Sequence, residues 1–147
     1  MIDMNIENRT TRFVEELFAD EIFVFGSNLQ GHHGKGAAKT AKRWGAKRGQ
    51  ADGLMGRTYG IPTKGMKMNI ILPISKVKSY VDDFVEFAKL HPEMKFLVTE
   101  VGCGLAKGGD NKRHELIAPL FVGAVHLENV SLPKKFWDVL AKQKPLI

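Results

Sequence analysis

The stretch FVFGSNLQGHHGKGAAKTA, Phe23–Ala41, passes from an apolar run through a glycine-rich loop into a series of good helix formers. It begins inside EIFVF (Glu21–Phe25), whose β-branched and aromatic residues predict a buried strand that stops at Gly26. After the loop, alanines and a tryptophan recur at the spacing of an apolar helical stripe, which predicts a helix over about Gly36–Lys47. The stretch is therefore a strand, a loop of bare backbone and a helix in direct succession.

The same alternation continues along the chain. We expect further strands at Arg57–Thr63, Lys95–Gly102 and Asn129–Pro133, and further helices from Ile74 to just before Pro92, over 113–124 and over 134–143. Strands that alternate with helices of about ten or more residues are typical of layered α/β folds. We therefore predict an α/β fold, a three-layer α/β/α sandwich with a mixed, mostly parallel sheet, formed as a single domain over 1–147.

The composition excludes several classes of protein. With 147 residues, of which 44% are hydrophobic, the chain suits one domain with a real core. No apolar run approaches the roughly 18 residues of a membrane span, and no signal-peptide segment is evident, so we expect a cytoplasmic protein without a membrane partner. Cys103 is the only cysteine, which rules out an internal disulfide and a cysteine-rich zinc site. Neither a metal nor a cofactor is expected.

The net charge of +6 is distributed unevenly. Between Leu29 and Tyr80 there are eleven Lys or Arg and one acid, Asp52, whereas the remainder of the chain holds eleven basic and fifteen acidic residues. A basic segment of this kind attracts phosphates, either on a nucleotide or along a nucleic acid. It is equally compatible with a solvated helix face.

Glycines gather in the loops that follow the predicted strands. In sheets of this type, ligands bind outside the carboxyl ends of the strands. The loops there are GSNLQGHHGKG, TKGMK and GCGLAKGGDN, and the first and third contain eight of the fifteen glycines. Glycine lets backbone N–H groups approach an anion closely, so the two loops favour a diphosphate cradle over simple tight turns.

The named phosphate motifs are absent. GHHGKGA has Gly34 followed by Lys35 but lacks the hydroxyl residue and the glycine spacing of a P-loop. The Gly-x-Gly-x-x-Gly dinucleotide fingerprint is also missing, because Lys39 stands where its third glycine would be. A P-loop nucleotide triphosphatase and a Rossmann dehydrogenase are therefore disfavoured.

Three motifs together resemble the macrodomains, a family of ADP-ribose-binding α/β/α modules. Asn28–Ala38, with an Asn six residues before Gly-Lys-Gly, resembles the loop of antitoxin-type macrodomains that remove ADP-ribose from DNA. YGIPTK (Tyr59–Lys64) resembles the strand whose terminal lysine is catalytic in those enzymes and in hydrolases of ADP-ribosylated glutamate. VGCGLAKG (Val101–Gly108) resembles their second phosphate loop. The similarity extends from Ile22 to about Phe121.

The resemblance implies a role for each motif. Asn28 would hydrogen-bond hydroxyls of the distal ribose, while the backbone of 34–37 and of 102–107 would hold the two phosphates. Lys64 would attack or polarise C1″ of that ribose. The ligand-binding residues would be Ser27, Asn28, Gly31, Gly34, Lys35, Gly36, Ala37, Gly102, Cys103, Gly104, Leu105, Ala106 and Lys107.

Two further residues are candidates for acid–base chemistry. One of the adjacent histidines in the first loop, His33 or its neighbour His32, would contact the ligand and either cap a phosphate or serve as an acid near pH 7. Glutamate-type hydrolases carry an Asp directly after Gly-Cys-Gly-Leu, a place that Ala106 occupies here and glycine occupies in the DNA-type enzymes. Asp110, four residues on, is our candidate for the missing carboxylate.

Three functions remain open at this stage. The first is an enzyme that hydrolyses ADP-ribosyl linkages on DNA, on protein or on a small NAD-derived nucleotide. The second is a module that binds or sequesters an ADP-ribose-like ligand without turnover. The third is a nucleic-acid-binding domain that uses the basic residues in and around the first helix, namely Lys35, Lys39, Lys42, Arg43, Lys47 and Arg48.

Overall fold

The computed structural model describes residues 8–11, 13–67, 70–103 and 113–142, and within them a six-stranded sheet runs in the order β1-β6-β5-β2-β4-β3. All neighbouring strands of this sheet are parallel except β3 and β4, which are antiparallel. The strands are β1 (Arg9–Thr10), β2 (Glu21–Asn28), β3 (Gly53–Met55), β4 (Thr58–Lys64), β5 (Lys95–Val98) and β6 (Val130–Pro133). The helices are α1 (Gly36–Ala41), α2 (Ile74–Leu90), α3 (Arg113–Ile117) and α4 (Lys134–Lys142), with 3₁₀ turns η1 (Lys42–Trp44) and η2 (Ala118–Ala124).

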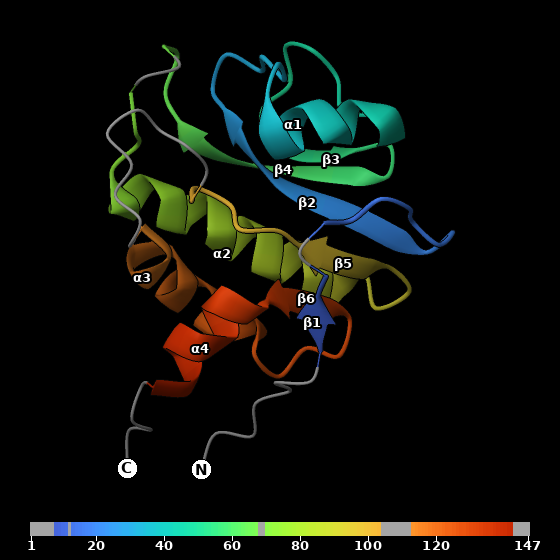
Figure 1. Cartoon of the computed structure of the whole chain (residues 1–147), viewed down its shortest axis with the longest axis vertical. Coiled ribbons are helices and arrows are strands. Elements are labelled where there is room, and N and C mark those ends of the chain that lie inside the picture. Colours follow the sequence, from blue (N-terminus) through green and yellow to red (C-terminus); the bar gives the residue numbers. More distant parts are fainter. Residues whose placement is uncertain (1–7, 12, 68–69, 104–112, 143–147) are drawn as a thin grey trace.

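The helices form a layer on each side of the sheet. α1 lies on one side, and α2, α3 and α4 lie on the other (Figure 1). The predicted three-layer α/β/α sandwich with a mixed, mostly parallel sheet is therefore confirmed.

Strand β2 is central and is buried on both faces. Val24 pairs with Val98 of β5 on one side and with Tyr59 of β4 on the other. Because side chains alternate along a strand, Ile22 and Val24 belong to one apolar cluster and Phe23 and Phe25 to the other. This double burial explains the nearly continuous apolar run of the sequence.

The larger core lies under α2, α4 and η2. Helix α2 buries Val77, Val81, Phe84, Val85 and Ala88, which recur at three- and four-residue intervals and so form one stripe. The ring of Phe84 is 5.4 Å from that of Phe96 on β5 and meets it edge-on. Packing of this kind fixes α2 against this face of the sheet.

The smaller core lies under α1. Phe23, Phe25, Ala41 and Met55 are buried there, and the ring of Trp44 lies 5.1 Å from that of Phe23. The helix is shorter than the sequence predicts, because η1 tightens the last turn and Gly45, at φ 115°, ends it. The first residues of α1, Gly36 and Ala37, lie near the carboxyl ends of the neighbouring strands.

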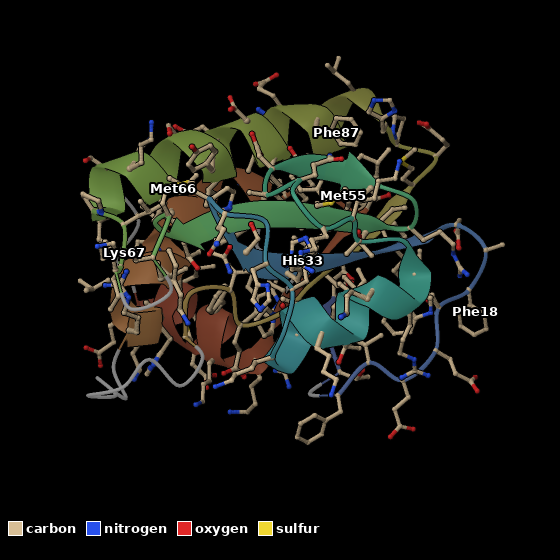
Figure 2. All side chains as sticks on the ribbon, turned by 90° about the horizontal axis from the view of Figure 1, so that it is seen from above. Phe18, His33, Met55, Met66, Lys67 and Phe87 are labelled. Atoms are coloured by element: carbon tan, nitrogen blue, oxygen red, sulfur yellow. The ribbon has the colours of Figure 1, made fainter. Side chains whose placement is uncertain are left out.

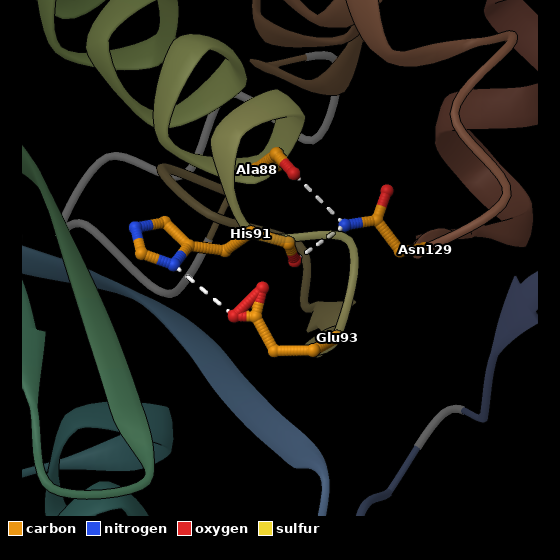
Figure 3. Close-up of polar contacts among 4 residues, drawn as sticks. All are labelled: Ala88, His91, Glu93 and Asn129. Atoms are coloured by element: carbon orange, nitrogen blue, oxygen red, sulfur yellow. Dashed lines mark hydrogen bonds and ion pairs between the residues drawn. The ribbon is translucent and has the colours of Figure 1, made fainter.

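Helix α2 ends where an asparagine from a distant loop caps it. Asn129 Nδ2 donates hydrogen bonds to the carbonyl oxygens of Ala88 (2.9 Å) and His91 (3.1 Å), as Figure 3 shows. His91 Nδ1 also lies 3.3 Å from a carboxylate oxygen of Glu93. These bonds satisfy carbonyls at a helix end and tie α2 to the approach to β6.

Several boundaries differ from the sequence-based expectation. Strand β5 ends at Val98 rather than Gly102, and the helix predicted over 113–124 divides into α3 and η2, with Pro119 in the first turn of the 3₁₀ segment. The short strands β1 and β3 were not predicted. Pro62 lies within β4, beyond the residues that pair with β3, where a residue without an N–H is tolerated.

None of the described helices combines the length and the apolar character that crossing a membrane requires.

Candidate functional site

Strands β2, β4 and β5 end side by side, and a cavity of about 290 Å³ lies at their carboxyl ends. Seven predicted site residues line it: Ser27, Asn28, Lys35, Gly36, Ala37, Lys64 and Gly102. The parallel pairing of the three strands explains why residues so far apart in sequence meet at one edge. We call this space the lysine cavity, after Lys35 and Lys64.

A second cavity of about 630 Å³ adjoins the first over the start of α1. The two share four lining residues, Gly36, Ala37, Thr99 and Glu100. The second cavity is also lined by Phe13, Phe23 and Val14, with Glu15 and Arg43 at its polar positions. We call it the aromatic cavity; together the two form one groove across the first turn of α1.

Asn28 is buried, and its side-chain amide makes hydrogen bonds to its own loop. Its Nδ2 donates to the carbonyl oxygen of His32 at 2.8 Å, and its Oδ1 accepts from the N–H of His32 at 3.0 Å. One N–H and one lone pair of the amide remain for a ligand. Asn28 therefore shapes the loop whatever it binds.

The glycines of this loop have different roles. Gly36, at φ 59°, borders the lysine cavity, and a Cβ added there would meet no atom within 4 Å. Gly31, at φ 70°, instead packs so tightly that a Cβ would lie 2.6 Å from the carbonyl carbon of Gly49. Neither Gly31 nor Gly34 lines the groove. The expected ligand-binding role of these two glycines finds no support in the structure, and Gly31 serves close backbone packing.

The two adjacent histidines point to different places. His33 is 3% exposed, and its Nε2 lies 2.9 Å from the carbonyl oxygen of Lys47 and 3.0 Å from that of Gln50. Two carbonyl acceptors require Nε2 to carry the proton. The ring also meets Phe25 edge-on at 5.3 Å. Figure 2 shows His33 well inside the outline of the molecule.

His32, not His33, lines the lysine cavity. The expected catalytic role of His33 does not fit its position, because its side chain joins the ligand loop to the turn at 47–50. The sequence gives no sign of this division, since both histidines stand between glycines. The two side chains point in opposite directions because neighbouring residues of an extended backbone do so.

Lys64 ends β4 and is half-buried at the cavity wall. Its carbonyl oxygen accepts a hydrogen bond from the N–H of Leu29 at 2.9 Å, which fixes the lysine beside the first loop. Within the described part of the chain its ammonium group makes no ion pair. The main chain of Lys64 is therefore fixed at the cavity wall, and its ammonium group has no ion-pair partner among the described residues.

Three polar residues of the lysine cavity were not predicted: Thr63, Thr99 and Glu100. Thr99 Oγ1 donates to the carbonyl oxygen of Val24 at 2.8 Å, which extends the attachment of β5 to β2 by one residue. The sequence predicts that this strand continues to Gly102, which would include Thr99 and Glu100. Neither was therefore considered as a loop residue. The early end of β5 puts both into the groove.

Cys103 lies next to this wall, but its thiol is not in the groove lining. Its Sγ is 3.4 Å from the carbonyl oxygen of Val101. Burial, together with the nearby Glu100 carboxylate, raises the pKa of the Cys103 thiol to about 12. The thiol is therefore protonated at neutral pH and is no nucleophile.

The remaining predicted site residues, Gly104, Leu105, Ala106, Lys107 and Asp110, lie outside the described residues. The basic residues around α1 are all described and all exposed: Lys35, Lys39, Lys42, Arg43, Lys47 and Arg48. None of the six forms an ion pair with another described residue. They give the side of the molecule above the groove a strong positive charge.

The described residues contain no group of three or more His, Cys, Asp or Glu side chains arranged to hold a metal ion. Comparison of the chain with protein-family models, with curated proteins and with solved structures gave no match.

Proposed function

We propose that the protein binds ADP-ribose, or a related NAD-derived nucleotide, in the groove formed by the lysine and aromatic cavities. The observation that carries this proposal is the continuity of the two cavities over Gly36 and Ala37. Their individual volumes of about 290 and 630 Å³ fall in or near the usual range of small-molecule sites. A dinucleotide is long enough to occupy both at once.

The two ends of the groove suit different parts of such a ligand. Phe13, which is 75% exposed, and the partly buried Val14 offer apolar surface to a nucleobase, and the Glu15 carboxylate offers an acceptor to an exocyclic amine. Lys35 and Lys64 at the other end favour negative charge. The ligand would therefore place its base in the aromatic cavity and its distal ribose beside Lys64.

The same arrangement supports hydrolysis of an ADP-ribosyl linkage on DNA, on protein or on a small nucleotide. With the distal ribose in the lysine cavity, the Lys64 ammonium would act at C1″ or on the leaving group. The competing possibility is a module that binds the nucleotide without turnover, and it uses the same groove.

A matched pair of glycine substitutions tests the groove. Gly36 and Gly49 both have positive φ, at 59° and 90°, and both have open space where a Cβ would stand. Only Gly36 borders the groove. Gly36→Leu and Gly49→Leu therefore carry the same kind of backbone strain, but only the first fills the shared part of the two cavities.

The measurement is titration calorimetry with ADP-ribose. We expect micromolar binding by the wild type, a loss of at least about tenfold in Gly36→Leu, and wild-type affinity in Gly49→Leu. Absence of binding by the wild type at millimolar ADP-ribose would contradict the proposal. Equal losses in the two variants would point to strain rather than to occupancy of the groove.

A second candidate is nucleic-acid binding by the basic surface around α1, which the six exposed cations without ion pairs favour. Contacts with several phosphates make affinity fall steeply with salt, whereas a nucleotide held in a groove responds weakly. Affinity for a DNA duplex, measured at two salt concentrations with and without Lys39→Gln and Lys42→Gln, distinguishes the two. A steep salt slope that these substitutions reduce would support the second candidate.

A further inference from the structure

Among the described residues that line the lysine cavity, Glu100 carries the only carboxylate. It also lines the aromatic cavity, so it lies where the two spaces meet. Its backbone carbonyl oxygen accepts a hydrogen bond from the N–H of Cys103 at 3.1 Å, in a tight turn directly after β5. The residue is therefore anchored by the main chain at the edge of the sheet.

Glu100 and Lys64 stand on opposite walls of the cavity. Lys64 ends β4 and Glu100 follows β5, and these two strands flank β2, whose last residue is Asn28. Neighbouring strands are about 4.8 Å apart, so the two walls are roughly 10 Å apart across β2. Both residues line the cavity of about 290 Å³ that lies between these walls.

The carboxylate of Glu100 has capacity for a further partner. Its Oε1 lies 3.7 Å from Nζ of Lys135, which is beyond hydrogen-bonding distance, and the two side chains are 36% and 58% exposed. Within the described residues no hydrogen bond to the Glu100 carboxylate is found. An exposed, long ion pair of this kind contributes little to stability. Among the described residues, nothing prevents the carboxylate from accepting a proton or a hydroxyl group.

We propose that Glu100 is the catalytic base of this site, an inference that rests on the proposed function. Glu100 would remove a proton from a water molecule whose oxygen forms a bond to C1″ of the ADP-ribosyl group. The bond from C1″ to the leaving atom breaks, and that atom keeps the electron pair and takes a proton from the Lys64 ammonium. Solvent then returns the proton from Glu100 to Lys64. The products are free ADP-ribose and the protonated leaving group.

This assignment gives the cavity a carboxylate although the sequence has Ala106 where glutamate-type hydrolases carry an Asp. A lysine and a carboxylate on opposite walls divide the work into protonation of the leaving group and activation of water. The carboxylate follows the same strand, β5, but six residues before the place where the resemblance leads one to expect it.

The test uses the full chain with two probes, an ADP-ribosylated peptide and an ADP-ribosylated oligonucleotide, and measures release of ADP-ribose. For the probe that the wild type cleaves, we expect Glu100→Gln to lower kcat by about 100-fold or more, the usual contribution of a general base. Its calorimetric Kd for ADP-ribose should stay within about threefold of the wild type, and Glu100→Asp should restore part of kcat.

Lys135→Met separates chemistry from structure. If Glu100 serves only to pair with Lys135, this variant lowers kcat as much as Glu100→Gln does, and that result would overturn the inference. A wild type that binds ADP-ribose but cleaves neither probe would also overturn it while leaving the proposed binding intact. A wild type that does not bind ADP-ribose at all would instead remove the proposed function itself.

Discussion

Asn28 and His32 are joined by two hydrogen bonds, from Asn28 Nδ2 to the His32 carbonyl oxygen (2.8 Å) and from the His32 N–H to Asn28 Oδ1 (3.0 Å). At the start of the glycine loop, the main-chain N–H and carbonyl of His32 are thus bonded by a side-chain amide instead of by another main-chain segment. The bonds set the shape of the loop that carries Lys35 and Gly36 to the groove. The shape of this part of the groove consequently depends on one side chain, that of Asn28.

Asn28→Ala should lower both stability and affinity. It leaves the N–H and the carbonyl of His32 without their partner, at a cost of about 1–3 kcal/mol to unfolding. The affinity for ADP-ribose should weaken because the loop loses its shape. The control is Asn129→Ala, which also removes two hydrogen bonds of one amide but lies at the far end of α2. Urea unfolding and calorimetry should show loss of stability in both variants and loss of binding only in Asn28→Ala.

Gly31→Ala should be far more destabilising than Gly49→Ala, although both positions have positive φ. A Cβ at Gly31 would lie 2.6–2.7 Å from backbone atoms of Gly49 and Gln50, whereas a Cβ at Gly49 meets nothing within 4 Å. Gly49→Ala therefore carries only the backbone strain, about 1 kcal/mol, while Gly31→Ala also forces the two loops apart. Urea midpoints that fall equally in both variants would show that the loops do not need this contact.

From the sequence alone one can predict the layers of the fold and the residues that the ends of β2, β4 and β5 contribute to the groove. The apolar run of β2, the stripe on α2 and the glycines after that run are local signals, although β2 extends to Asn28 rather than stopping at Gly26 as predicted. Parallel pairing then implies that Asn28, Lys64 and Gly102 share one edge of the sheet, as they do.

The residues that the sequence missed depend on information that is not local. Whether β5 ends at Val98 or at Gly102 decides whether Glu100 is a strand residue or a groove residue, and the pattern VTEVG fits both. Likewise, the burial of His33 depends on Lys47 and Gln50, which approach it only after α1 and η1 have turned the chain back. The macrodomain resemblance stays a prediction.

His33→Ala and His32→Ala should have opposite consequences. Removing His33 takes one hydrogen bond from each of the carbonyl groups of Lys47 and Gln50 and leaves a void beside Phe25, so unfolding should become easier by about 2–4 kcal/mol. His32 is partly exposed and its ring lines the groove, so its loss should leave stability nearly unchanged and alter ADP-ribose affinity. Thermal unfolding with and without ADP-ribose measures both effects. A stable His33→Ala variant with a normal loop would contradict the structural role.

Cys103 should behave as a buried thiol with a delayed ionisation. Its pKa is raised from 9.0 to about 12 in the folded protein, chiefly by burial and further by Glu100. The unfolded chain therefore loses this proton near pH 9, while the folded chain retains it. The thiol's contribution to stability is complete below pH 9 and is lost as the pH rises from 9 toward 12.

The two consequences are measurable with Cys103→Ser as the reference. At pH 8.5 iodoacetamide should alkylate the folded protein much more slowly than the urea-unfolded protein, because the thiolate is the reacting form. Between pH 8.5 and 10.5 the wild type should lose more unfolding free energy than Cys103→Ser, which has no ionising group at this position. Rapid alkylation of the folded protein, or parallel pH dependences of the two proteins, would show that the thiol is not held in its neutral form.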